Sequence, residues 1–389
     1  MSDWVLGLLS HDAAGLLLAA IMLLPGLALI KSGRRRVERR GRWAAFAVGF
    51  SMSLLSGLMV IGALVHLAQT RQVAAKYPPP GRFVDVGGHR VHILAEGEAR
   101  GRPTLVWFAG GHTGGYAIHN LHRRMVGQFR SILIDRPGTG WSDVGTFPRT
   151  TAKEADEMWA ALDAAGEKGP FVLVGHSFGG LLSANMARRH PERVKALILL
   201  DATPPDTIVY GPVLGALGDM RRDALFGGLL GLFAIDYEKL KGTPPPPPPV
   251  AKLLATIDRE LGAPGEAVRE LEKSPAAHMA SYSIYRELSP AGLASVAWNT
   301  VVYDGDLSPL PVFLVAPGDL KEFGTLNEAA NAEQREAMRM QRFFAATRER
   351  YLATSVNSER VVAPEGTGHN FPYEAPAFVV ATVARAALQ

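Results

Sequence analysis

Two long apolar segments near the N-terminus restrict the folds open to this chain more than any other feature. Residues 13–30 are almost wholly apolar, and residues 44–68 are apolar with His66 as the only strongly polar residue near their end. A helix of about 20 such residues crosses a bilayer core about 30 Å thick. We therefore predict a transmembrane helical hairpin within residues 1–70. The alternative is a buried helical hairpin in a soluble protein.

The intervening loop, residues 31–42, carries seven Lys or Arg residues and a single acid, Glu38. Loops of this composition stay on the cytoplasmic side of a membrane, so we expect both ends of the chain outside. A cleaved signal peptide has its basic residues before the apolar run rather than after it, so we expect both helices to be retained. The rest of the chain would then lie on the periplasmic side of a bacterial inner membrane, or in an equivalent compartment.

The basic loop also accounts for the charge of the chain. The formal charge is +4 and the loop alone contributes +6, so the remainder is −2. Proteins that bind nucleic acid spread basic residues over a folded face, and this distribution excludes that class of partner. The chain has no cysteine, which excludes disulfides, thiolate metal sites and cysteine nucleophiles.

A Pro-rich linker, residues 71–81, follows the hairpin and contains three consecutive prolines that form a stiff spacer. Short apolar strands then alternate with helices, which predicts an α/β fold with a mostly parallel sheet covered on both faces. The two halves of this core are residues 82–201 and 310–389. The expected strands are residues 83–86, 90–94, 104–108, 131–134, 171–174, 195–200, 311–315 and 360–362, and a closing helix is expected at residues 374–388.

The alternation fails over residues 202–309, which we interpret as an inserted helical cap. Six prolines after Thr243 predict an extended surface loop within it. Residues 225–235 are unusually apolar. They form either the core of the cap or a face that contacts lipid or an acyl substrate.

The expected strand 171–174 leads into Gly175-His176-Ser177-Phe178-Gly179, and a helix is expected from residue 181. A G-x-S-x-G motif between a strand and a helix predicts a nucleophile elbow, a strained turn that exposes the serine hydroxyl. The glycines let the neighbouring backbone pass without a Cβ clash. The amide of Phe178 would point at a developing oxyanion from the start of a helix, whose dipole favours negative charge.

Three segments together resemble the α/β-hydrolase superfamily, and most closely its bacterial membrane-tethered serine hydrolases. They are the elbow at residues 175–180, the sequence DRPGTGWS at residues 135–142, and GTGH at residues 366–369. The resemblance covers roughly residues 82–389. It implies a Ser–acid–His triad in that chain order, and it does not specify the substrate.

His369 is the expected base, because it lies in a flexible loop between the last strand and the last helix, where it can pass a proton to the leaving group. Two aspartates compete for the role of acid. Asp201 directly ends the strand after the elbow, as in superfamily members that carry the acid one strand early, and Asp319 follows the next strand close to the usual position. We favour Asp201 and keep Asp319 as the alternative.

The second oxyanion donor is expected at Gly111, in the loop after the third strand, where Ala109 departs from the His-Gly of the family. We expect a membrane-anchored serine hydrolase of the carboxylesterase or lipase type, which needs no metal or organic cofactor and takes a small-molecule or lipid-like ester. The alternatives are an amidase or aminopeptidase of the proline iminopeptidase type, and a non-catalytic binding protein on the same fold.

Overall fold

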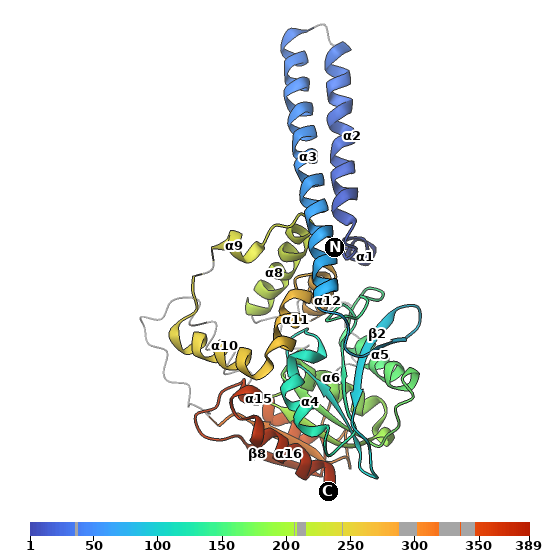
Figure 1. Cartoon of the computed structure of the whole chain (residues 1–389), viewed down its shortest axis with the longest axis vertical. Helices are drawn as coiled ribbons and strands as arrows, with labels where there is room; N and C mark the ends of the chain where they lie inside the picture. Colours follow the sequence, from blue (N-terminus) through green and yellow to red (C-terminus); the bar gives the residue numbers. More distant parts are fainter. Residues whose placement is uncertain are drawn as a thin grey trace. The chain divides into compact units, whose positions relative to one another are not determined.

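The structure is a computed structural model of the whole chain (Figure 1). It describes residues 1–35, 38–205, 207, 215–242, 244–287, 302–318, 335 and 347–389. The chain divides into two compact units. The first comprises Met1–Pro78, Asp223–Pro244 and Lys273–Met279, and the second comprises Pro79–Arg222, Pro245–Glu272 and Ala280–Gln389.

The first unit contains the N-terminal hairpin, built from α1 (Asp3–Leu9), α2 (Ala14–Arg35) and α3 (Arg39–Lys76). Both long helices continue beyond their apolar runs. The predicted basic loop is therefore largely helical, and residues 71–76 of the predicted linker belong to α3. The helices extend past the apolar runs because Lys, Arg and Gln at their ends are good helix formers. Apolar composition therefore marks only the part of each helix that is suited to lipid.

Small residues line the contact between α2 and α3. A Cβ atom at Gly49 would lie 2.6 Å from the carbonyl oxygen of Gly26, so the two backbones approach closely. The Ser56 hydroxyl donates to the carbonyl oxygen of Ala19, 2.8 Å away on the other helix. Interfaces of small residues with interhelical hydrogen bonds are typical of helices that pack within a membrane. The buried small residues recur at seven-residue intervals, at Ala19, Gly26 and Gly33 of α2 and at Gly49, Ser56 and Ala63 of α3.

The outer faces of the hairpin carry large apolar side chains. Both helices are long and apolar enough to cross a membrane, each with a mean hydropathy of 2.1, and only 22% and 17% of their apolar windows are buried. The exposed side chains include Leu24, Phe50, Leu58 and Ile61.

The second unit is organised around a sheet that has eight strands among the described residues, in the order β1-β2-β4-β3-β5-β6-β7-β8. β1 pairs antiparallel with β2, and β2 pairs antiparallel with β4. The remaining neighbours in the order β4-β3-β5-β6-β7-β8 are parallel. The strands are β1 (Arg82–Asp85), β2 (Arg90–Glu96), β3 (Thr104–Phe108), β4 (Ser131–Ile134), β5 (Phe171–His176), β6 (Val194–Leu200), β7 (Val312–Ala316) and β8 (Ser358–Val362).

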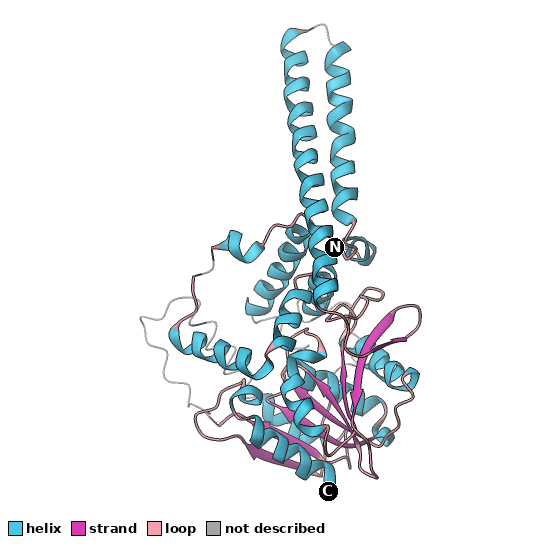
Figure 2. Ribbon diagram, viewed as in Figure 1, coloured by secondary structure: helices cyan, strands magenta, loops and turns pink. Residues whose placement is uncertain are grey.

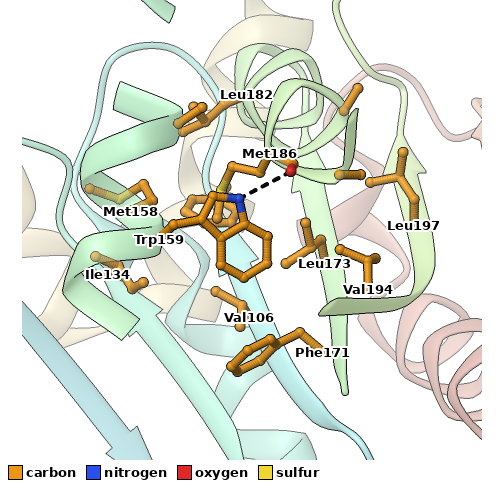
Figure 3. Packing of buried hydrophobic residues seen from close by; sticks show 14 of the residues in the cluster. Val106, Ile134, Met158, Trp159, Phe171, Leu173, Leu182, Met186, Val194 and Leu197 are labelled. Carbon is orange, nitrogen blue, oxygen red and sulfur yellow. Dashed lines mark hydrogen bonds between the residues drawn. The ribbon is translucent and has the colours of Figure 1, made fainter. Parts of the chain in front are cut away.

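Helices cover both faces of this sheet, as predicted (Figure 2). On one face, α5 (Thr151–Ala164) and α6 (Phe178–Arg189) pack on alternate strand residues such as Val106, and the Trp159 indole donates to the carbonyl oxygen of Met186 at 3.0 Å (Figure 3). On the other, α4 (His119–Met125) and α16 (Pro376–Leu388) pack on Leu105 and Trp107. Shorter elements are η1 (Gly115–Ile118), η2 (Pro191–Arg193), η5 (Glu349–Thr354) and α15 (Phe371–Glu374).

Helical segments follow β6 where the alternation fails. They are α8 (Gly215–Gly231), α9 (Tyr237–Lys241), α10 (Pro248–Leu261), α11 (Ala263–Leu271) and α12 (Pro275–Glu287). α8 and α12 each contribute residues to both compact units, and α9 belongs to the first. The last predicted helix, residues 374–388, corresponds to α16, and the short helix α15 precedes it. The two are separate because Pro372 and Pro376 each occupy the first turn of a helix and have no N–H to continue the preceding one.

Candidate active site

Ser177 occupies the sharp turn between β5 and α6. Its backbone has φ 51° and ψ −122°, a conformation that an L-residue adopts only at a cost of about 1–3 kcal/mol. A Cβ atom at Gly175 or Gly179 would overlap backbone atoms, so both glycines of the motif are required by close packing. Every residue of 171–180 is buried except Ser177, which is partly exposed. The turn therefore presents the serine as the predicted elbow requires.

His369 lies beside the elbow in the loop before α15. Its backbone carbonyl accepts a 2.9 Å hydrogen bond from Nε2 of His176, and the centroids of the two imidazole rings are 4.7 Å apart. The side chain of His369 is 48% exposed. Burial and the neighbouring His369 lower the pKa of His176 to about 3, so His176 stays neutral and braces the loop that carries His369.

Asp201 is paired with His369. Nδ1 of His369 lies 2.6 Å from Oδ2 of Asp201, whose side chain is 4% exposed. The carboxylate fixes the orientation of the ring and leaves Nε2 as the nitrogen available to a substrate or nucleophile. The competing residue, Asp319, lies outside the described residues.

The backbone at Asp201 is also strained. Asp201 has φ 41°, and the described non-glycine residues with positive φ are Arg100, Ser177, Asp201 and Ala234. Strained residues persist where surrounding structure holds them, often at functional sites. Here the amide of Asp201 donates to the Val315 carbonyl at 2.8 Å, and the amide of Ser177 donates to the Leu200 carbonyl at 3.1 Å. The carboxyl ends of β5, β6 and β7 are thus tied together.

Arg348 is a residue of the site that sequence reasoning missed. Its Nε lies 2.5 Å from Oδ1 of Asp201, so the carboxylate contacts a histidine through one oxygen and an arginine through the other. Both members of this ion pair are buried, with 8% of Arg348 and 5% of Asp201 exposed. No local motif marks Arg348, because it reaches Asp201 from a distant part of the sequence.

The loop after β3 approaches the elbow. A Cβ atom at Gly110 would lie 3.1 Å from Cβ of Ser177, so this loop passes directly over the serine. Gly111 has φ 56°, in the region that favours glycine. Arg136 holds the loop through Nη2, which donates to the carbonyl oxygens of Gly111 and Thr113. Its guanidinium also lies 5.5 Å from the centre of the Phe178 ring. Arg136 therefore joins both predicted oxyanion donors.

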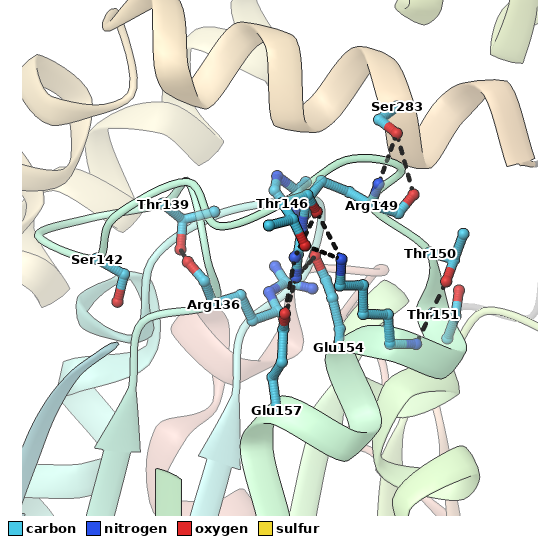
Figure 4. A network of polar contacts seen from close by, with 12 residues as sticks. Arg136, Thr139, Ser142, Thr146, Arg149, Thr150, Thr151, Glu154, Glu157 and Ser283 are labelled. Carbon is cyan, nitrogen blue, oxygen red and sulfur yellow. Dashed lines mark hydrogen bonds and ion pairs between the residues drawn. The ribbon is translucent and has the colours of Figure 1, made fainter. Parts of the chain in front are cut away.

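A buried polar network lies behind Arg136 (Figure 4). Glu154 accepts from Nε2 of His112 at 2.8 Å and lies 3.9 Å from the Arg149 guanidinium, which pairs with Glu157. Burial acts to raise the pKa of Glu154, but His112, Arg136 and Arg149 lower it overall. Glu154 is therefore ionised, and the His112 side chain belongs to this network.

Two comparisons with known proteins bear on this geometry. A family model described as the alpha/beta hydrolase fold matches residues 103–231, which include the elbow and Asp201. The solved enol-lactonase from Burkholderia xenovorans LB400 superimposes with a TM-score of 0.51 over 79% of this chain and all of the other, at 16% identity. The chain has the α/β-hydrolase fold, and residues 103–231 match that family. The superfamily's fold accounts for the strand order and for the turn at Ser177.

Curated relatives in the superfamily match only part of the chain. An uncharacterized protein of Bacillus subtilis, YbdG, is 27% identical over 171 residues, which are 43% of this chain and 52% of that protein. The 2-(acetamidomethylene)succinate hydrolase of Mesorhizobium japonicum is 28% identical over 123 residues, 32% of this chain and 43% of that enzyme. The chain thus matches about half of these relatives or less, and the matches indicate a hydrolase without indicating its substrate.

Proposed function

We propose that this protein is a membrane-anchored serine hydrolase that cleaves a carboxylic ester through Ser177, His369 and Asp201. The observation that carries the proposal is the 2.6 Å contact between His369 and Asp201, made beside a strained and partly exposed serine. The superfamily's hydrolase relatives favour the same reaction class.

Ser177 attacks the ester carbonyl while Nε2 of His369 takes its proton. Asp201 stabilises the resulting imidazolium, and the amides of Phe178 and Gly111 donate to the tetrahedral oxyanion. His369 returns the proton to the leaving alcohol, and an acyl-enzyme remains on Ser177. Water activated by His369 then releases the carboxylic acid. Each oxyanion donor contributes roughly 3–4 kcal/mol in related sites.

The hairpin supplies the anchor in this proposal. It is supported by the exposed apolar faces of α2 and α3 and by the small-residue contact between them. The basic residues at the turn of the hairpin favour the cytoplasmic side, so the hydrolase domain would face the periplasm. A C-terminal alkaline phosphatase fusion tests this orientation. An active fusion is expected, and an inactive one at normal expression would contradict it.

A fluorophosphonate probe tests the chemistry. Wild-type protein in detergent should be labelled, and Ser177→Ala should not. Ser183→Ala is the matched control and should be labelled like the wild type. Ser183 lies on α6, further along the chain than Ser177, and is fully buried, so its hydroxyl should not react with the probe. A folded wild-type protein that takes up no label would instead support a binding protein on the same fold. A panel of aryl esters of increasing chain length, run beside aminoacyl arylamides, then separates esterase from aminopeptidase activity.

A further inference from the structure

The turn that follows α8 rests directly on the hairpin within the first unit. A Cβ atom at Gly15 would lie 2.6 Å from the carbonyl oxygen of Leu232, and one at Gly62 would lie 2.7 Å from that of Phe233. Leu232 is fully buried, as is Ala63 on the same side of α3. Two helical glycines therefore form a seat for this turn, because any side chain at those positions would push it away.

The seat lies near one end of the expected bilayer core. Trp43 is the first apolar residue after the basic residues of α3 and is 60% exposed, as suits a tryptophan at the interface. Gly62 follows it by 19 residues, which at ~1.5 Å per residue is about 28 Å along the helix. A core of about 30 Å that begins at Trp43 thus ends close to Gly62, at the boundary away from the basic turn.

The segment held at this boundary exposes apolar and aromatic side chains. Phe226 and Ile235 are each 43% exposed and Leu240 is 68% exposed. The rings of Phe226 and Tyr237 stack with centroids 5.8 Å apart, and the Lys241 ammonium lies 5.4 Å from the centre of the Tyr237 ring. Apolar side chains mixed with tyrosine and lysine are typical of the headgroup region, where each side chain keeps an apolar stem in lipid and a polar end in water.

We propose that residues 223–242 form a membrane-interface segment whose partner is the lipid surface of the leaflet away from the basic turn. This inference rests on the membrane anchorage proposed above. The segment lies among the lipid headgroups, seated on Gly15 and Gly62, with Phe226, Ile235 and Leu240 directed to the acyl boundary. The hairpin thereby does more than tether the enzyme, because it fixes part of the inserted region at the bilayer surface.

The lack of cysteine makes the chain suited to single-site labelling. Phe226→Cys and Leu240→Cys, labelled with the fluorophore NBD, are placed in vesicles of phosphatidylcholine and phosphatidylglycerol as full-length protein. Leu58→Cys, in the middle of α3, is the reference for lipid, and Val356→Cys, 81% exposed in the second unit, is the reference for water. At positions 226 and 240 we expect NBD emission to be blue-shifted relative to position 356. We expect this emission to be quenched by doxyl lipids and not by iodide.

The reference positions separate the ways in which the inference can fail. If positions 226 and 240 respond to iodide as position 356 does while position 58 responds to doxyl lipids, the anchor is real and the interface segment is refuted. If position 58 also responds to iodide, both the anchor and the segment are refuted. Labelling of Ser177 by the fluorophosphonate probe reports the chemistry independently in either case.

The seat has a matched test of its own. Gly62→Leu should displace the turn and move NBD at position 240 toward the iodide response of position 356. Gly57→Leu, in the same helix, is the control, because a Cβ at Gly57 meets no neighbouring element within 4 Å. Equal responses of the two variants would refute the seating of the turn on Gly62.

Discussion

Asp201→Asn is the substitution that discriminates most sharply among the roles assigned to the site. The carboxylate contacts His369 through Oδ2 and Arg348 through Oδ1, and it is almost fully buried. An asparagine keeps the shape of the side chain but cannot stabilise an imidazolium, and it favours the wrong tautomer of His369. In serine protease triads the same change lowers kcat by about 10⁴, which corresponds to about 5 kcal/mol in the activation barrier.

The same substitution has a separate effect on stability. It leaves the buried Arg348 guanidinium without its counter-ion, and breaking a buried ion pair costs roughly 3–5 kcal/mol. Arg348→Gln alone should therefore lower stability by a similar amount and retain most of kcat, because Asp201 still holds His369. The double variant should recover part of the lost stability, since neither charge is then unpaired, without recovering activity.

The assay is kcat and KM on an aryl ester, with thermal unfolding of the same detergent-solubilised samples. Asp319→Asn is the matched control and should keep kcat within a few-fold of wild type. Replacement of a triad acid lowers kcat by about 10⁴. If Asp201→Asn retains more than about a tenth of the wild-type kcat, the assignment of the acid is wrong. If Arg348→Gln is inactive at temperatures where it is folded, the division of roles between the two oxygens of Asp201 is wrong.

Three further changes test other contacts. Burial raises the pKa of Glu287 to about 7, against the opposing hydrogen bonds from Thr151, above an ordinary value of 4.5. The stabilisation by its protonated form is complete below pH 4.5 and is lost as the pH rises through 7. The free energy of unfolding of Glu287→Gln should therefore gain on that of the wild type across that window, by on the order of 3 kcal/mol, and a difference that stays constant with pH would contradict the shift. Arg136→Lys should lower kcat more than it raises KM, because one ammonium cannot reproduce the guanidinium that bonds two loop carbonyls. An effect on KM alone would contradict the role of this loop in oxyanion binding. Gly49→Leu should weaken the hairpin, because its Cβ would meet the carbonyl oxygen of Gly26, and an unchanged melting temperature would contradict that packing.

The centre of the sheet could be predicted because its strands are buried along their length. β3 and β4 coincide with the predicted ranges, since contiguous apolar residues of that length have few alternatives to a strand covered on both faces. The helix limits were predicted less well. α3 extends to Lys76 because helix propensity continues where hydropathy stops.

In the candidate site, too, local features could be predicted and tertiary contacts could not. Ser177 and His369 could be located because local motifs mark them. The pairing of Asp201 with His369 joins residues 168 positions apart, and the positive φ that accompanies it is imposed by the ends of three strands. Arg348 belongs to none of the motifs, and its only signature is its tertiary contact with Asp201. Local sequence thus identifies the elbow, while the partners of the base depend on the closed sheet.

The two residues with left-handed backbone at the site, Ser177 and Asp201, set a limit on how this protein can be improved. A glycine at either position would adopt the observed turn without steric penalty. A screen that rewards only heat resistance would therefore tend to discard the two side chains proposed as nucleophile and acid. Directed evolution of a hardier variant therefore needs an activity filter in every round, and gains should be sought at positions remote from the ends of β5 and β6.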